Sequence, residues 1–144
     1  VIMGYGAVGV TKSGCGSVPP AAEAYPYCFH DAPIPYSNCD YIVINHGTND
    51  RGKPVEEFTA RYNELLDVIC AHNPKSRIFI VNPFCGAWEA ELQEIAASYT
   101  KNTGRKIEFI CSTGWISPQR IHPDRAGHET VAEHLAEELR KLGV

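Results

Sequence analysis

Short apolar runs alternate with amphipathic helical patterns from residue 40 to the end of the chain. The runs at 41–45, 77–81 and 107–111 have the length and composition of buried strands. After each run, apolar residues recur at helical spacing, over 55–69, 88–99 and 131–142. A chain that repeats strand and helix in this way forms parallel strands joined by right-handed crossovers. The pattern therefore predicts an α/β protein with helices on both faces of a parallel sheet.

Proline, asparagine and glycine mark the expected ends of the helices. Pro54 suits a first helical turn, Asn73-Pro74 ends the first helix, and the second helix closes near Gly104. The last helix begins near Asp124 or Arg125. We therefore expect a three-layer α/β/α sandwich with a flavodoxin-like parallel sheet. Its predicted core contains Ile42, Ile44, Phe58, Leu65, Ile69, Ile78, Ile80, Leu92, Phe109, Val131 and Leu135.

Composition limits the classes of function. The chain has 144 residues, which suits a single domain over 1–144. The formal net charge is −4 and there is no run of Lys or Arg, so nucleic-acid binding and a polybasic membrane anchor are not expected. No apolar run approaches the ~18 residues of a membrane span. The sequence does not reveal the oligomeric state.

The cysteines and the first residue bear on localisation. Six cysteines are scattered without a Cys-x-x-Cys pair, which favours free thiols and a reducing compartment such as the cytoplasm. The sequence begins with Val1 and not with Met, so we expect it to be part of a longer chain. The localisation therefore stays unknown, since a signal peptide would lie outside this sequence.

The first 40 residues follow a different pattern. Residues 1–16 are apolar and glycine-rich, and we expect a strand stub followed by a glycine loop. Residues 19–36 carry five of the ten prolines and are expected to form an irregular surface segment. Gly4, Gly6 and Gly9 spell G-x-G-x-x-G, but no amphipathic helix follows them, so a dinucleotide site is not expected.

Two polar clusters follow strands, and ligands of open parallel sheets lie at the carboxyl ends of strands. The first cluster is 47–50, after the strand at 41–45, and the second is 121–128, before the last helix. The amide of Asn49 could donate to an oxyanion and His122 could act as general base. The alternative is that Asn49 and Asp50 cap a turn and that His122 is a surface residue.

Three blocks of the sequence resemble the SGNH (GDSL-like) hydrolases. The stretch 41–50, YIVINHGTND, is similar to their G-x-N-D block, and HPDRAGH at 122–128 is similar to their H-P-x-x-x-G-H block. The stretch GYGAVGVT at 4–11 resembles their glycine block. The blocks occur in the family's order and span nearly the whole chain.

The resemblance implies an ester hydrolase without a cofactor, acting on a small-molecule acyl ester. It implies a serine nucleophile, with His122 as base and Asn49 as side-chain donor of the oxyanion hole. The backbone donor falls in the glycine block, at Gly9 or at the Gly6-Ala7 step. Asp50 is expected to orient its loop and not to react. Short-chain esters, carbohydrate esters and lysophospholipids are the substrates that the family suggests.

This sequence departs from the family in two ways. It has no Gly-Asp-Ser, so we expect the nucleophilic serine upstream of Val1. The usual triad acid precedes the histidine by three residues, and Gln119 occupies that position. A main-chain carbonyl at 117–119 could orient His122 instead. Asp124 is the side-chain alternative, although its position favours an N-cap. The triad acid is therefore unassigned.

A zinc site and a binding module are the alternatives to a serine hydrolase. His128-Glu129 begins like H-E-x-x-H, but Ala132 occupies the second histidine position and His134 lies on another helix face, so no metal site is expected. From the sequence, Trp115 is equally compatible with lining a substrate pocket and with packing in the hydrophobic core. Without a serine, the chain could instead be a non-catalytic binding module that keeps the hydrolase pocket.

The resemblance also predicts a structural gap. In the family the strand order is 2-1-3-4-5, so the absent first strand would separate a strand ending at 1–3 from the strand at 41–45. Its loss leaves a space of about 9.6 Å between two unpaired edges. Unsatisfied backbone groups cost about 1–3 kcal/mol each, so we expect that residues 1–144 do not hold this fold alone.

Overall fold

A computed structural model describes residues 3–35, 39–117 and 119–144. It contains a three-stranded parallel sheet with the order β3-β4-β5. The strands are β3 (Tyr41–Ile44), β4 (Arg77–Val81) and β5 (Ile107–Ile110). Each lies within one residue of its predicted run, because a β-branched run between polar turns leaves little choice of boundary. The parallel α/β architecture is confirmed.

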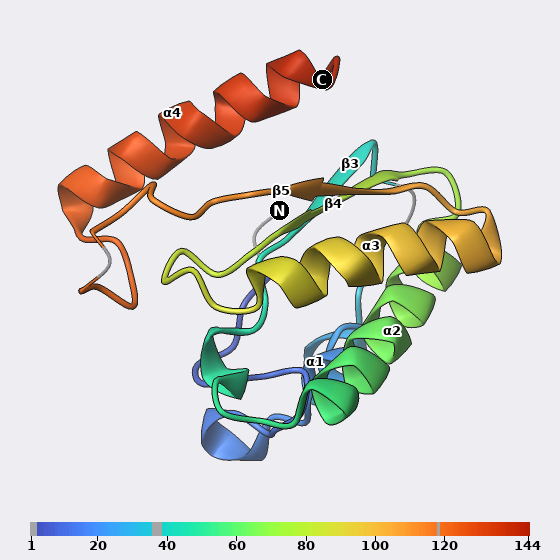
Figure 1. Ribbon diagram of the computed structural model, residues 1–144. Coiled ribbons are helices and arrows are strands. Elements are labelled where there is room, and N and C mark those ends of the chain that lie inside the picture. The colour runs from blue at the N-terminus through green and yellow to red at the C-terminus, as the bar shows by residue number, and fades with distance from the viewer. Residues whose placement is uncertain (1–2, 36–38, 118) are drawn as a thin grey trace.

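Long helices cover both faces of this sheet (Figure 1). Helices α2 (Val55–His72) and α3 (Glu89–Thr103) lie below the sheet in that view, and α4 (Arg125–Lys141) lies above it. Gly104 ends α3 with φ +72°, a left-handed conformation that glycine adopts without strain. The carboxylate of Asp124 accepts from Gly127 N at 2.8 Å and caps α4. The three-layer sandwich is therefore confirmed.

Two apolar clusters form the core, one on each face of the sheet. The larger cluster packs α2 and α3 against the sheet, and the smaller cluster places α4 over Phe79, Val81 and Ile110. Only Val131 of α4 is buried, so this helix is held less tightly than α2 and α3. Eight of the eleven predicted core residues are buried; Ile42, Phe109 and Leu135 are half-buried and pack against the clusters.

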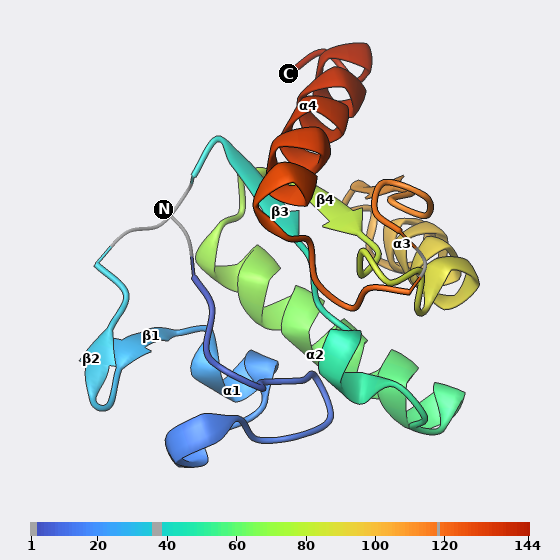
Figure 2. The same cartoon turned by 90° about the vertical axis from the view of Figure 1, so that its left-hand side faces the viewer.

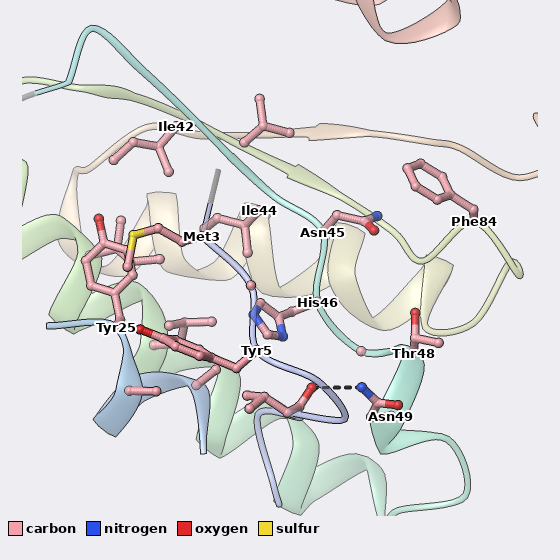
Figure 3. A pocket seen from close by; sticks show the side chains of 18 of the residues that line it. Met3, Tyr5, Tyr25, Ile42, Ile44, Asn45, His46, Thr48, Asn49 and Phe84 are labelled. Atoms are coloured by element: carbon pink, nitrogen blue, oxygen red, sulfur yellow. Dashed lines mark hydrogen bonds between the residues drawn. The ribbon is translucent and has the colours of Figure 1, made fainter. Parts of the chain in front are cut away.

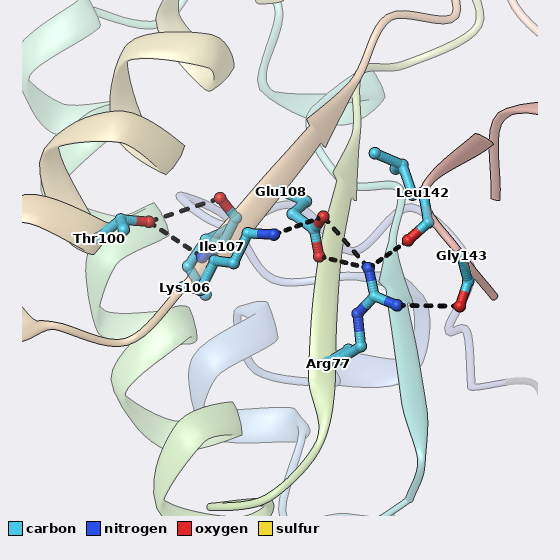
Figure 4. Close-up of polar contacts among 7 residues, drawn as sticks. All are labelled: Arg77, Thr100, Lys106, Ile107, Glu108, Leu142 and Gly143. Carbon is cyan, nitrogen blue, oxygen red and sulfur yellow. Dashed lines mark hydrogen bonds and ion pairs between the residues drawn. The ribbon is translucent and has the colours of Figure 1, made fainter.

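A polar network fixes the far end of α4 to the sheet (Figure 4). The guanidinium of Arg77 contacts the carboxylate of Glu108 at 3.0 Å and donates to the carbonyls of Leu142 at 2.8 Å and Gly143 at 3.4 Å. Lys106 reaches the same carboxylate at 2.9 Å. Partial burial acts to raise the pKa of Glu108, but the hydrogen bonds from Lys106 and Arg77 outweigh it, so the pKa is lowered.

The amino-terminal part is more regular than the sequence predicts. It contains a 3₁₀ turn (Cys15–Ser17), a short helix α1 (Ala21–Ala24) and a hairpin of β1 (Tyr27–Phe29) and β2 (Ala32–Pro33), seen at the lower left of Figure 2. The expectation of an irregular surface segment over 19–36 was wrong at α1, whose alanines 21, 22 and 24 are buried, and at the hairpin, where prolines at 26 and 33 weaken the strand pattern. Met3 belongs to no strand, and residues 1–2 lie outside the described part of the chain.

All six cysteines are unpaired. Among the described residues, no helix has the length and the apolar content needed to cross a membrane.

Candidate functional site

A cavity of about 690 Å³ runs along the outer edge of β3 and past its carboxyl end. Every residue from Tyr41 to Asn49 lines it. Met3, Tyr5 and Val8 of the amino-terminal segment line it as well, and Figure 3 shows Met3 and Tyr5 beside Ile44 and His46. Alanines of α1 and two apolar residues of α2 close one side. The rim is formed by Phe84, by Ile121, His122 and Pro123 of the loop before α4, and by His128 in the first turn of α4. Asn49 and His122, far apart in sequence, therefore face one cavity.

A tight turn at Gly47 brings the strand end into the cavity. Gly47 has φ +126°, and a Cβ there would lie 3.0 Å from Cδ1 of Trp88 and 3.2 Å from Pro83. The indole of Trp88 donates to the Gly47 carbonyl at 3.1 Å and stacks on Phe58 with 4.0 Å between ring centroids. This backbone conformation and the crowding both require glycine. The turn leads directly into the 3₁₀ turn Thr48–Asp50.

Asn49 and Asp50 of this turn have opposite surroundings. Asn49 is exposed to the cavity, and its Nδ2 donates to the Val8 carbonyl at 2.9 Å, which leaves the second amide hydrogen unused. Asp50 is fully buried and accepts from Val10 N at 3.0 Å, Thr11 N at 2.8 Å and Thr11 Oγ1 at 2.7 Å. Both side chains thus hold the glycine loop against the end of β3.

Several backbone N–H groups of the glycine loop, including those of Gly6 and Ala7, make no hydrogen bond within the described part of the chain. Val8 N donates to the Tyr5 carbonyl at 3.2 Å, which closes a turn with Ala7 at φ +60°. Gly9 N donates to the Lys12 carbonyl at 3.1 Å, so this N–H is already engaged. Of the two candidate positions, Gly9 is therefore engaged, whereas the N–H groups of the Gly6-Ala7 step are available. Neither Gly6 nor Ala7 is among the residues that line the cavity.

No described side chain orients the His122 imidazole. His122 is exposed on the rim and makes no hydrogen bond to residues 3–35, 39–117 or 119–144. The side-chain carbonyl of Gln119 accepts from the Ser117 hydroxyl. The carboxylate of Asp124 is held by Gly127 N and by Arg120 at 2.9 Å. Neither of the two candidate orienting side chains contacts the histidine.

The cavity also contains a histidine that the sequence reasoning missed. His46 follows β3 and shares the side of Ile42 and Ile44, because alternate residues of a strand face the same way. Figure 3 shows its ring in the cavity near Tyr5. Burial lowers the pKa of His46, and the negative charge of Asp50 opposes that change only in part. The imidazole is therefore neutral at neutral pH. The alternation along β3 was the signal that could have revealed it.

Two kinds of reactive group are missing from the described cavity wall. No serine among the described residues lines it; Ser112, for example, is buried and donates to the Asn82 carbonyl at 2.6 Å. No group of three or more His, Cys, Asp or Glu in the described part of the chain could hold a metal ion. His128 lines the rim, while His134 lies outside the cavity and stacks on Trp115 with 5.5 Å between ring centroids.

Solved structures with the same fold are carbohydrate esterases. A family two carbohydrate esterase from Clostridium thermocellum, in complex with cellohexaose, aligns over 95% of this chain and 48% of its own, with TM-score 0.70 and 24% identity. A family 2 carbohydrate esterase with a carbohydrate-binding domain, from Corynascus thermopiles (Myceliophthora fergusii), aligns over 96% and 51%, with TM-score 0.70 and 23% identity.

A third structure is described as a carbohydrate esterase whose active site displays divergent catalytic and non-catalytic binding functions. It aligns over 93% of this chain and 50% of its own, with TM-score 0.73 and 20% identity. The chain thus spans about half the length of these proteins and shares their fold, as the SGNH resemblance predicts. No protein-family model matches the sequence, and no curated protein matches it.

Proposed function

We propose that this chain carries most of the active site of a serine esterase that removes short acyl groups from carbohydrates. Asn49 and His122 face one cavity at the carboxyl end of β3, and this observation carries the proposal. The fold shared with carbohydrate esterases supports ester hydrolysis and favours a carbohydrate over a lysophospholipid as the alcohol part. The nucleophile is a serine supplied from outside residues 1–144.

The proposed chemistry uses Asn49 and His122, which line the cavity, and the N–H of Ala7, which lies in the glycine loop outside the lining residues. The serine Oγ bonds to the acyl carbon while its proton passes to the imidazole of His122. The carbonyl oxygen becomes an oxyanion, which accepts from the free amide hydrogen of Asn49 and from the N–H of Ala7. Collapse of this intermediate breaks the bond to the sugar oxygen, which takes the proton from His122. Water then hydrolyses the acyl-enzyme by the same route, with His122 again acting as base.

The remaining residues have supporting roles in this proposal. Asp50 positions the glycine loop through its bonds to Val10 and Thr11, and so sets the direction of the Ala7 N–H. Gly9 provides the space that the Asp50 carboxylate needs. Asp124 caps α4 directly after the base, and Gln119 stiffens the preceding loop through Ser117. A main-chain carbonyl orients the imidazole.

The proposal is tested by esterase assays on the polypeptide that contains residues 1–144 together with its serine. His122→Gln should abolish turnover of a p-nitrophenyl acetate probe and of acetylated xylo-oligosaccharides. His128→Gln is the matched control, because both histidines are exposed on the rim of the same cavity. Equal activity of the two variants would contradict the proposal.

A non-catalytic carbohydrate-binding role is the second candidate. Two observations favour it: no described serine lines the cavity, and no described side chain orients His122. One structure with this fold combines catalytic and non-catalytic binding functions. Binding of cello-oligosaccharide by isothermal titration, with no ester turnover by the serine-containing polypeptide, would select this role.

A further inference from the structure

The end of β4 is joined to the end of β5 by side-chain hydrogen bonds that continue the backbone ladder. The last paired residues of the ladder are Val81 and Ile110. One residue beyond Val81, the side-chain Oδ1 of Asn82 accepts from Ser112 N at 2.7 Å, and the Asn82 carbonyl accepts from the Ser112 hydroxyl at 2.6 Å. Both residues are completely buried. The chain that leaves β5 is therefore fixed to the carboxyl end of β4.

Asn82 also contacts the wall of the cavity. Its carbonyl accepts a second hydrogen bond, from Nδ2 of Asn45 at 2.9 Å. Asn45 directly follows β3 and lines the cavity (Figure 3). A carbonyl oxygen has two lone pairs, so it can accept from Asn45 and from Ser112 at the same time. The backbone of Asn82 thus joins the cavity wall at β3 to the chain that leaves β5.

The chain that leaves β5 is the loop that carries His122. Of the described residues between β5 and α4, only Ser112 and Ile116 are buried. Trp115 N donates to the Ser112 carbonyl at 3.1 Å and closes a turn at the start of the loop. Ile116 then lies near the first turn of α4, because its Cγ2 would be 3.8 Å from a Cβ added at Gly127. Ser112 is thus one of two buried points that hold the described part of this loop.

We infer that Asn82 is a positioning residue, which fixes the loop carrying His122 relative to the end of β3 that leads into Asn49. The inference rests on the proposed function, in which His122 and Asn49 act on the same ester group. Proton transfer requires the base to lie within hydrogen-bonding distance of the serine, and a misplacement of about 1 Å can cost about a hundredfold in rate. Asn82 does not line the cavity, so it acts through the loop and not on the substrate.

The contacts of Asn82 require a side chain that both accepts and donates. Its Oδ1 is the acceptor for the buried Ser112 N, and its Nδ2 donates to Thr113 Oγ1 at 3.2 Å. The Thr113 hydroxyl in turn donates to the carboxylate of Glu89, the first residue of α3. Alanine at position 82 would leave Ser112 N without its acceptor, whereas aspartate keeps an acceptor there in either protonation state. The two substitutions therefore isolate the contribution of this hydrogen bond.

The test uses the polypeptide that contains residues 1–144 together with its serine. Asn82→Ala should lower kcat for p-nitrophenyl acetate by about tenfold to a hundredfold, because the base is misplaced. KM should change by less than about twofold, since the backbone carbonyl that holds Asn45 in the cavity wall is still present. Asn82→Asp should keep kcat within about threefold of the parent, because Ser112 N retains its acceptor.

Asn73→Ala is the matched control for Asn82→Ala. Asn73 is also buried, but it lies between α2 and the start of β4, where its Nδ2 donates to Tyr25 Oη at 2.8 Å and to the Ile69 carbonyl at 3.1 Å. Both variants lose the side-chain bonds of a buried amide, so urea unfolding should show a comparable loss of stability. Asn73→Ala should nevertheless keep kcat within about twofold of the parent, because the loop of His122 is untouched.

Amide exchange measured by NMR tests the positioning separately from turnover. Asn82→Ala should accelerate exchange at Trp115 and Arg120 by at least about tenfold, since their N–H groups close turns of the loop before His122. Asn73→Ala should leave both amides as slow as in the parent.

Three results would each overturn the inference: equal exchange at Arg120 in the two alanine variants, equal kcat in those variants, or a kcat for Asn82→Asp as low as that for Asn82→Ala. A parent protein without ester turnover would contradict the proposed function, and exchange at Arg120 would then decide the inference by itself.

Discussion

Gly9 is the position where the structure allows the sharpest prediction. A Cβ added at Gly9 would lie 2.8 Å from both Cγ and Oδ2 of Asp50, and closer still to Oδ1. Real Cβ atoms do not approach a carboxylate so closely, so either the loop or the carboxylate must move. Asp50 is fully buried and is held by three hydrogen bonds to the glycine loop. Gly9→Ala should therefore break its bonds to the glycine loop.

The size of the effect follows from the hydrogen bonds at risk. The Asp50 carboxylate accepts from two backbone N–H groups and one hydroxyl, and bonds to a charged group contribute about 1.5–3 kcal/mol each. Loss of the two backbone bonds alone should cost about 3 kcal/mol or more. Amide exchange at Val10 and Thr11, measured by NMR, should accelerate by about a hundredfold or more. Urea unfolding gives the accompanying loss of stability.

Gly4→Ala is the matched control for this variant. A Cβ at Gly4 would meet nothing within 4 Å, so we expect a change within about 0.5 kcal/mol. If Gly9→Ala left the exchange of Val10 and Thr11 as slow as Gly4→Ala does, the reasoning on the Asp50 contact would be refuted.

Three further predictions concern the site and its support. Asn49→Ala should lower esterase turnover about 10²–10³-fold, the usual loss for one oxyanion donor, while Gln119→Ala should cost little because Gln119 contacts Ser117 and not His122. At pH 7 the free energy of unfolding of Glu108→Gln should be about 1 kcal/mol lower than that of the parent protein. Because the folded pKa of Glu108 is lowered, this deficit should shrink as the pH falls below 4.5; a constant deficit would point to packing alone. Since the pKa of His46 is lowered below 6.5, the unfolded state binds the proton first, and stability should fall as the pH drops from about 6.5. His46→Gln should flatten that slope, whereas His30→Gln on the exposed hairpin turn should not.

The sequence predicts the central fold well because its signals are local and strong. The strand at 77–81 contains the continuous apolar run 78–81, and the stripe from Val55 to Ile69 repeats at helical spacing. Asp124 was expected as an N-cap and accepts from Gly127 N. The hairpin at 27–33 has no such signal, since prolines flank it and all three residues of β1 are exposed. Its formation depends on tertiary contacts such as the bond from Tyr5 to the Tyr27 carbonyl.

The candidate site was predictable only in part. The motifs identified Asn49 and His122, and both residues line the same cavity. The choice between Ala7 and Gly9 depends on which backbone N–H is already engaged, and a hydrogen bond to Lys12 cannot be read from residue spacing. The sequence could have identified His46, because alternate residues of a strand face the same side and His46 continues the series of Ile42 and Ile44. The orienting partner of His122 stays a prediction.

Labelling with a fluorophosphonate tests the central proposal most directly. The polypeptide that contains residues 1–144 and its serine is treated with the probe, digested, and mapped by mass spectrometry. We predict that the probe labels one serine and that this serine lies outside residues 1–144. His122→Gln should abolish the labelling, whereas His128→Gln should preserve it. Labelling of a serine within residues 1–144, or labelling that survives His122→Gln, would contradict the account.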